Sequence, residues 1–430
     1  MRFPKSIQLG VVAASVATTS AFGISLDLIP EISGDAVSVT MQGFATTPDG
    51  KFVVGIAGSR GFVYQTYGAG FGTTYNVLGG GAQATTANGV GYRTSGGNTE
   101  LLISGFSSGF PTEWMTTDGG ATFTGRRRNA SMPGTPQMGT ANQLGSQLGS
   151  DIYYVSSSRN ASGQPVYLNQ GSGAWGASGP AVFTWDNKGI TSPSSSIMRG
   201  VSAIGRAVGR RGSSGANDQA YVMDWVSGTP SAYFINTLND GLNGGNLQMG
   251  EAWSVSQNGV AVFGRSFLTG TSGDLYSFKT TIAGFAGTHA QGAVNRLPEL
   301  AGTGGSTGRT TPYGASADGR YAVGMDYLGI EKAALWDTGD GNPLNWTVMD
   351  LTQYAIDRGI IGNWLRLARA YSVGVDPLTG DPIVTGQGVW SPDGGATLYT
   401  RAWVMQIPEP SSLSLLALGG LAALVARRRK

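Results

Sequence analysis

The chain has 430 residues and a formal net charge of +2, and it contains no cysteine and one histidine. Disulfides are therefore excluded, so an apolar core must stabilise the fold, and zinc or copper sites built from histidine and cysteine are excluded as well. Glycine supplies 70 residues, far above its usual share of about 7%, beside 10 Trp, 16 Tyr and 15 Phe. This composition is typical of many short strands joined by tight turns.

Residues 1–23 have the pattern of a secretory signal peptide. Arg2 and Lys5 give a charged start, Ile7 to Ala17 form an apolar core, and small residues up to Gly23 offer a cleavage site. We expect a signal helix that is removed. An uncleaved N-terminal anchor is the alternative, and the short apolar core disfavours it.

Residues 24–406 contain a repeated unit. Each copy has a small or polar start, an Asp-Gly or Asn-Gly turn, an apolar strand that ends in glycine, and a second strand with an aromatic residue. The clearest copy runs from Gly314 to Gly324 and continues at Lys332 to Trp336. Asp-Gly and Asn-Gly supply the positive φ angles of tight hairpin turns. The strand-ending positions lie near 55, 105, 157, 209, 264, 324 and 386, and the copies between 84 and 168 are weaker.

The length of the repeat predicts a fold. Each unit has room for about four short strands, which is the size of one propeller blade. A closed ring lets neighbouring blades bury both faces of each sheet and leaves few exposed edges. We therefore predict an all-β propeller of about seven four-stranded blades over residues 24–406. A β-solenoid is the alternative, although its repeats are usually shorter.

The repeat resembles the HAF-type extracellular repeats of bacterial surface proteins. Ser316 to Gly324 matches the centre of that repeat, and Leu78 to Gly81 matches the glycine-rich run before it. Leu351 to Leu365 resembles the short helix and tryptophan that precede the last repeat in such proteins. The resemblance implies architecture and an extracellular location, because the family has no agreed activity.

Two segments resemble the Asp-box of sialidase-like propellers. Thr116 to Phe123 fits the Ser/Thr-x-Asp-x-Gly-x-Thr-aromatic pattern, and Ser391 to Leu398 fits it nearly as well. The resemblance implies that Asp118, Gly120, Asp393 and Gly395 form structural hairpin turns that lie away from any active site.

Catalytic residues are not evident. A glycosidase needs two carboxylates across the scissile bond, but acids are sparse, and Asp49 and Asp318 are better explained as turn residues. His289 stands in a glycine-rich stretch without a Gly-x-Ser-x-Gly elbow, so we expect a surface loop. Asp337 to Asn342 offers oxygen ligands for calcium but lacks EF-hand spacing, so a plain turn is favoured and no cofactor is expected.

Residues 407–430 form a three-part tail. Pro408, Glu409 and Pro410 precede an uncharged stretch up to Ala426, and Arg427, Arg428, Arg429 and Lys430 end the chain. We expect a transmembrane helix, although the stretch is shorter than the roughly 20 residues of an upright span, with the cations on the cytoplasmic side. The prolines keep the preceding segment extended.

The tail resembles the PEP-CTERM sorting signal. That resemblance implies temporary anchoring in the inner membrane of a Gram-negative bacterium, processing by an exosortase, and delivery to the cell surface or extracellular matrix. Pro408, Glu409, Pro410, Arg427, Arg428 and Arg429 are the predicted sorting residues. A C-terminal anchor that is never cut is the alternative.

The two ends account for the positive charge. They hold six of the 28 basic residues and one of the 26 acidic residues, so the body has 22 basic and 25 acidic residues, a net charge of about −3. This balance disfavours nucleic acid as a partner, since the basic run Arg126 to Arg128 is better explained as a solvated loop.

The expected function follows from the tail and the repeats together. We expect an exported, non-catalytic propeller with a binding or structural role toward extracellular polysaccharide, a partner that the exosortase resemblance implies. A propeller hydrolase or lyase acting on polysaccharide is the alternative. Converging carboxylates in the central channel would distinguish it.

Overall fold

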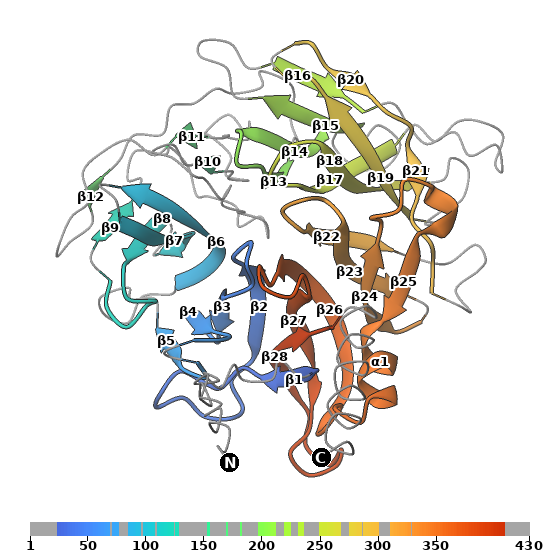
Figure 1. Ribbon diagram of the computed structural model, residues 1–430. Helices are drawn as coiled ribbons and strands as arrows, with labels where there is room; N and C mark the ends of the chain where they lie inside the picture. Colours follow the sequence, from blue (N-terminus) through green and yellow to red (C-terminus); the bar gives the residue numbers. More distant parts are fainter. Residues whose placement is uncertain are drawn as a thin grey trace, which may run out of the picture.

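The computed structural model shows a β-propeller of six blades, each a sheet of four or five strands, arranged around one axis (Figure 1). The structure describes residues 24–408 apart from 69–70, 77–84, 96–97, 108–109, 124, 129–152, 155–168, 171–180, 183–196, 212–218, 225–230, 236–248, 268–274, 286, 301–309 and 328. The prediction of an all-β propeller is confirmed, and the prediction of seven blades is wrong.

The blades follow one another along the chain, and the first strand of each lies nearest the axis (Figure 1). The first blade contains β2 (Met41–Thr46), β3 (Phe52–Ala57), β4 (Arg60–Gln65) and β5 (Thr74–Asn76). The second contains β6 (Thr85–Ser95), β7 (Asn98–Ser107), β8 (Phe110–Thr116) and β9 (Gly125–Arg128). The third contains β13 (Ile197–Val201), β14 (Arg206–Arg211), β15 (Gln219–Asp224) and β16 (Ser231–Phe234).

The remaining three blades have the same order of strands. The fourth contains β17 (Met249–Val255), β18 (Ala261–Phe267) and β19 (Leu275–Ala283), with β20 (Ala290–Gln291) and β21 (Asn295–Arg296) both paired to β19. The fifth contains β22 (Thr311–Ala315), β23 (Tyr321–Tyr327), β24 (Glu331–Asp337) and β25 (Thr347–Asp350). The sixth contains β26 (Trp364–Val375), β27 (Pro382–Trp390), β28 (Tyr399–Gln406) and β1 (Ser25–Leu28).

The expected unit near position 157 lies mostly outside the described residues. Its described residues form only β10 (Tyr153–Tyr154), paired with β11 (Asn169–Gln170), and β12 (Ala181–Val182), which adds to the second blade in parallel with β9. Position 157 itself lies outside the described residues. The sequence prediction of this unit rested on a weaker copy of the repeat, which has no Asp-Gly or Asn-Gly turn. Arg126 to Arg128 lie in β9, a strand and not the expected loop.

The ring is closed by the first described strand. β1 pairs antiparallel with β28, with Ser25 opposite Gln406. The buried Arg401 forms an ion pair with Glu31 and donates to the carbonyl of Ile29 at 3.1 Å. At the other end the backbone N–H of Ile407 donates to the carbonyl of Pro382 at 3.0 Å. The N-terminal and C-terminal ends of the propeller body are therefore hydrogen-bonded within one blade.

The turns between the first and second strands share one pattern of hydrogen bonds. In the fifth blade the hydroxyl of Ser316 donates to Asp318 at 2.5 Å and accepts from the backbone N–H of Tyr321 at 2.9 Å, and Gly319 has a φ of 75°. The turns at 47–52 and 256–261 repeat these contacts. Neighbouring turns are also joined, since the N–H of Gln257 donates to the carbonyl of Ala317 at 2.9 Å. The repeated turn therefore holds adjacent blades together.

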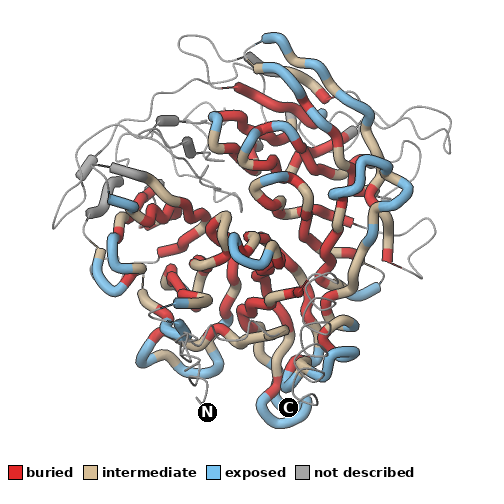
Figure 2. The backbone as a smooth tube through the Cα atoms, in the orientation of Figure 1, coloured by how far each residue is buried: buried red, intermediate tan, exposed pale blue. Residues whose placement is uncertain are grey.

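The glycines that the sequence predicted at strand ends lie inside the second strands of their blades instead, opposite β-bulges in the innermost strands. A Cβ on Gly324 would overlap the carbonyl oxygen of Thr311, across a register shift between Pro312 and Gly314. Gly55, Gly105 and Gly386 meet the innermost strand in the same way. Most of the backbone of the blades is buried (Figure 2). The bulges leave six half-buried residues between buried neighbours: Phe44, Asn88, Arg199, Trp253, Tyr313 and Tyr371.

Helix is scarce in the described part of the chain. The described helices are α1 (Leu351–Asp357) and the short 3-10 helix η1 (Pro343–Asn345). The carboxylate of Asp350 caps α1 by accepting from the backbone N–H groups of Thr352 and Gln353. Neither helix is long and apolar enough to cross a membrane. The predicted signal helix and the predicted transmembrane helix lie outside the described residues.

Candidate functional site

A cleft of about 290 Å³ opens between the first and second blades. This volume is at the lower end of small-molecule sites, which begin at about 300 Å³. The cleft lies where the turns of the two blades meet, and ten residues line it: Lys51, Phe52, Gln65, Tyr92, Thr99, Leu101, Thr116, Thr117, Asp118 and Gly119. Sequence reasoning singled out the Asp-box segment, which supplies Thr116 to Gly119, but it placed that segment away from any active site. It did not predict the cleft, because the wall is assembled from two repeats and no local motif spans it.

The floor of the cleft is apolar and aromatic. Phe52 and Leu101 are buried and Tyr92 is half-buried, and all three belong to the apolar layer between the two blades. The rings of Phe52 and Tyr92 meet edge to face, with centroids 6.3 Å apart. The cleft is therefore the open end of an inter-blade core.

A hydrogen bond across the blade boundary fixes the ring of Tyr92. Its hydroxyl donates to the carboxylate of Asp49 at 2.9 and 3.1 Å. Burial and the negative charge of Asp49 both raise the pKa of Tyr92, so the phenol stays protonated and remains a donor. Asp49 also accepts from the hydroxyl of Thr47 and the N–H of Lys51, as a turn residue does.

The first Asp-box forms one wall of the cleft. Asp118 accepts from the hydroxyl of Thr116 at 2.7 Å and from the backbone N–H of Thr122 at 2.9 Å. Burial raises the pKa of Asp118, but these hydrogen bonds outweigh it and lower the pKa to about 2. Gly119 and Gly120 have φ angles of 73° and 102° and carry the turn against the first blade, where a Cβ on Gly119 would contact Phe52.

The second Asp-box has the same internal contacts at a different place. Asp393 accepts from the hydroxyl of Ser391 at 2.8 Å and from the backbone N–H of Thr397 at 2.8 Å, and Gly395 donates to Ser391 at 2.7 Å. Hydrogen bonds from Thr397 and Ser391 lower the pKa of Asp393 to about 2. This turn joins the second and third strands of its blade and is exposed, whereas the first box joins the third and fourth strands.

The bulge residues contact one another around the axis. Trp253 meets Tyr313 at 5.1 Å between centroids, Tyr313 meets Tyr371 at 5.3 Å, and Tyr371 meets Phe44 at 5.7 Å. The guanidinium of Arg199 lies 4.0 Å from the ring centroid of Trp253. Four neighbouring blades thus share an aromatic ladder, and Arg199 extends it to a fifth.

The carboxylates beside this ladder are ion-paired. Glu251 is fully buried and lies 2.7 Å from Arg199, 2.8 Å from Arg265 and 3.7 Å from Arg210. Burial raises its pKa, but the three arginines outweigh burial and lower it. Glu331 forms an ion pair with Arg369.

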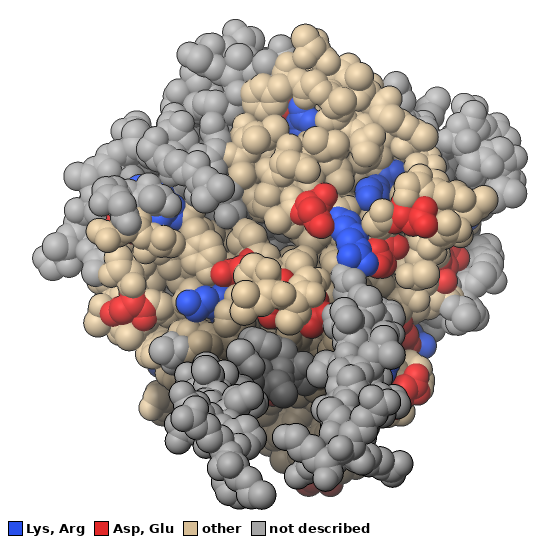
Figure 3. Space-filling view, viewed as in Figure 1, with Lys and Arg blue, Asp and Glu red and all other residues tan. Residues whose placement is uncertain are grey.

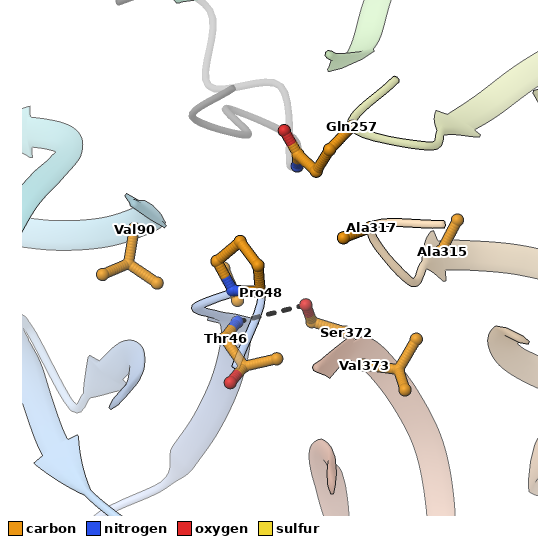
Figure 4. Close-up of a pocket in the computed structure, with 9 residues that line it drawn as sticks. Thr46, Pro48, Val90, Gln257, Ala315, Ala317, Ser372 and Val373 are labelled. Atoms are coloured by element: carbon orange, nitrogen blue, oxygen red, sulfur yellow. Dashed lines mark hydrogen bonds between the residues drawn. The ribbon is translucent and has the colours of Figure 1, made fainter. Parts of the chain in front are cut away.

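A separate pocket at the axis is too small for a sugar. It lies among the first turns of several blades, where the backbone N–H of Thr46 donates to the hydroxyl of Ser372 at 3.1 Å (Figure 4). Pro48, Gln257 and Ala317 complete its rim. Its volume of about 30 Å³ is roughly a tenth of the 290 Å³ of the cleft.

His289 lies on a loop, as predicted, but its side chain is not exposed, contrary to the prediction. Its side chain is only 4% exposed, and its Nε2 lies 2.8 Å from the buried carboxylate of Asp224. Arg206 donates twice to the same carboxylate, at 2.6 and 2.8 Å, and also to the carbonyl of Gly259 in the next blade at 2.7 Å. The glycine-rich stretch suggested exposure, but a partner 65 residues earlier buries the ring.

The other predicted residues are placed as follows. Asp337 lies 2.8 Å from Arg320, and Asp340 accepts from the N–H of Asn342 at 2.7 Å; the described residues contain no group of three or more acidic or histidine side chains placed to hold a metal ion. Pro408 is buried at the end of the propeller body, whereas Glu409, Pro410, Arg427, Arg428 and Arg429 lie outside the described residues. On the face in Figure 3, the basic side chains of the described residues form no continuous patch, and several lie beside acidic ones.

Comparison with known proteins identifies the tail. Residues 406–430 match the family described as the PEP-CTERM protein-sorting motif. No curated protein sequence matches the chain. The fold and this motif define an exported β-propeller. More particularly, the chain is an exosortase substrate that passes through a membrane-anchored stage.

Solved propellers resemble the chain only distantly. The β-propeller domain of Cps50 (Swd1) from Myceliophteria thermophila is 10% identical, with 89% of this chain and 99% of that chain covered and a TM-score of 0.48. The WD40 domain of SCAP from fission yeast is 11% identical, with coverages of 90% and 98% and a TM-score of 0.39. TolB from Acinetobacter baumannii is 12% identical, with coverages of 74% and 79% and a TM-score of 0.35. The strand topology, not these scores, establishes the propeller.

Proposed function

We propose that this exported propeller is a non-catalytic binding protein for extracellular polysaccharide and that the cleft between its first two blades is the sugar site. The observation that carries the proposal is an aromatic floor beside a polar rim. A sugar ring has an apolar face that packs on Tyr92. Its hydroxyls then meet the side chains of Gln65, Thr99 and Thr117, which both donate and accept hydrogen bonds.

The charges in the cleft support binding over cleavage. A glycosidase holds one carboxylic acid with a raised pKa beside a second carboxylate. Asp118 is the one carboxylate in the lining of the cleft, and its pKa of about 2 is lowered by its own turn. Glu251 and Glu331 near the axis are ion-paired with arginines. No observation favours the hydrolase or lyase alternative.

The tail and the repeats support a place outside the cell. Exosortase processing would release the propeller from the inner membrane of a Gram-negative bacterium to the cell surface or matrix. The resemblance to HAF-type extracellular repeats agrees with that destination. A propeller suits it as well, because the closed ring leaves few strand edges open to aggregation.

Native affinity electrophoresis through gels that contain a panel of bacterial polysaccharides tests the proposal. The purified protein is compared with Thr117→Trp, which fills the cleft from an exposed position, and with Thr347→Trp, an equally exposed position on the fifth blade. The wild type and Thr347→Trp should be retarded by at least one polysaccharide and Thr117→Trp should not. If all three proteins migrate freely on every gel, the proposal is wrong.

A further inference from the structure

We propose that the cleft selects acidic sugars and that Lys51 binds their carboxylate. This inference rests on the proposed polysaccharide-binding function and names the class of sugar that the same site takes. Lys51 is the one cationic residue in the cleft lining, and it is half-exposed. Its Nζ lies 5.4 Å from the ring centroid of Phe52, so the ammonium sits above the aromatic floor.

The carboxylates near Lys51 have hydrogen-bond partners within the protein, whereas the ammonium of Lys51 has no ion-pair partner among the described residues. Asp118 accepts hydrogen bonds from Thr116 and Thr122, and Asp49 accepts from Tyr92, Thr47 and the backbone of Lys51. Both carboxylates are therefore engaged by hydrogen-bond donors of the protein. Within the described residues the ammonium of Lys51 has no ion pair, so its charge is left facing the cleft.

A uronic acid satisfies both features of the site at once. Its ring packs on Tyr92 while its carboxylate pairs with Lys51, in a charge-assisted hydrogen bond that is stronger than one between neutral groups. The propeller body carries a net charge of about −3, which gives no general attraction to polyanions. A preference for acidic polysaccharide must therefore come from a local cation such as this one.

The test compares polygalacturonate with its methyl ester, two polymers that differ in the charge of one group per sugar. Affinities are measured by isothermal titration calorimetry at low salt for the purified wild type, Lys51→Met and the control Lys332→Met. Lys332 is half-exposed on the fifth blade and pairs with Asp350 at 3.0 Å. Methionine keeps most of the length of the lysine side chain and removes the charge.

The wild type and Lys332→Met should bind the acid about five- to tenfold more tightly than the ester, since the ion pair is partly exposed. Lys51→Met should lose that preference and bind the ester as before. Equal binding of acid and ester by the wild type, or an unchanged preference in Lys51→Met, overturns the role of Lys51 while the polysaccharide function stands. Binding of neither polymer by the wild type, together with free migration in the electrophoresis panel, overturns both proposals.

Discussion

The hydroxyl of Tyr92 donates to both carboxylate oxygens of Asp49, at 2.9 and 3.1 Å, and so joins the second blade to the first turn of the first blade. The same contact fixes the aromatic ring that forms the floor of the cleft. The side chain of Tyr92 therefore both links the first two blades and forms part of the proposed sugar site. Two substitutions separate these roles.

Tyr92→Phe keeps the ring and removes the hydrogen bond, whereas Tyr92→Ala removes both. The loss of a hydrogen bond to a charged group should lower the free energy of unfolding by about 1–2 kcal/mol in Tyr92→Phe. Polysaccharide affinity should stay within about twofold in Tyr92→Phe and fall about tenfold or more in Tyr92→Ala, because stacking requires the ring. Urea denaturation and calorimetric titration measure the two effects. Equal affinities for all three proteins would remove Tyr92 from the sugar site.

The glycines inside the second strands, opposite the β-bulges, should not tolerate a side chain. Gly324→Ala places a Cβ against the carbonyl oxygen of Thr311, so we expect a loss of about 2–4 kcal/mol in the free energy of unfolding. Gly341→Ala is the matched control, since a Cβ there meets open space, and its effect should stay within about 0.5 kcal/mol. Chemical denaturation of both variants decides the matter. Similar stabilities would show that the bulge does not require glycine.

The buried ion pair between Arg206 and Asp224 should contribute much more to the free energy of unfolding than an exposed ion pair does. Arg206→Met removes the two guanidinium N–H groups that donate to the buried carboxylate of Asp224. The free energy of unfolding should therefore fall by about 3–5 kcal/mol. Arg320→Met breaks a pair with Asp337 whose two side chains are more than one third exposed, and should cost about 0–1 kcal/mol. The comparison uses guanidinium denaturation at pH 7. A loss of the same size in both variants would contradict the assigned burial.

The first Asp-box gives the protein a defined response to acid. The folded pKa of Asp118 is about 2, below the ordinary value of 3.8, so its contribution to stability is present above pH 4 and is lost as the pH falls toward 2. Asp118→Asn should unfold at a lower temperature than the wild type at pH 7. The difference between the two melting temperatures should shrink as the pH falls from 4 to 2. A difference that is constant over this range would mean that the charge of Asp118 does not stabilise the turn.

The boundary between propeller and tail can be tested by truncation. Ile407 is buried in the core of the last blade and its N–H is bonded, so a chain that ends at Gln406 should be less stable than one that ends at Pro408 by about 2–3 kcal/mol. Both lack Glu409 and Pro410, so both should miss the compartment that the full-length chain reaches. Cell fractionation and thermal denaturation read out the two effects. Delivery of the Pro408 form to that same compartment would show that the tail does not direct sorting.

The sequence predicted those features that depend on local chemistry. The Asp-Gly turn at Asp318 and Gly319, the glycine at position 324 and the Pro-Glu-Pro tail each carry their signal within a few residues. Ring closure by β1 has no such signal, because residues 25–28 contain no repeat motif and pair with a strand almost 380 residues away. The cleft and the burial of His289 were missed for the same reason. Lys51 and Asp118, like His289 and Asp224, become neighbours only when adjacent blades pack together.

A crystal structure of the protein with a bound acidic oligosaccharide would test the central claim most directly. We predict a sugar ring packed on Tyr92 in the cleft between the first and second blades, with its carboxylate beside Lys51. Ring atoms should lie about 4 Å from the aromatic face. A sugar bound elsewhere, such as at the aromatic ladder around Trp253, with the cleft unchanged, would contradict the account.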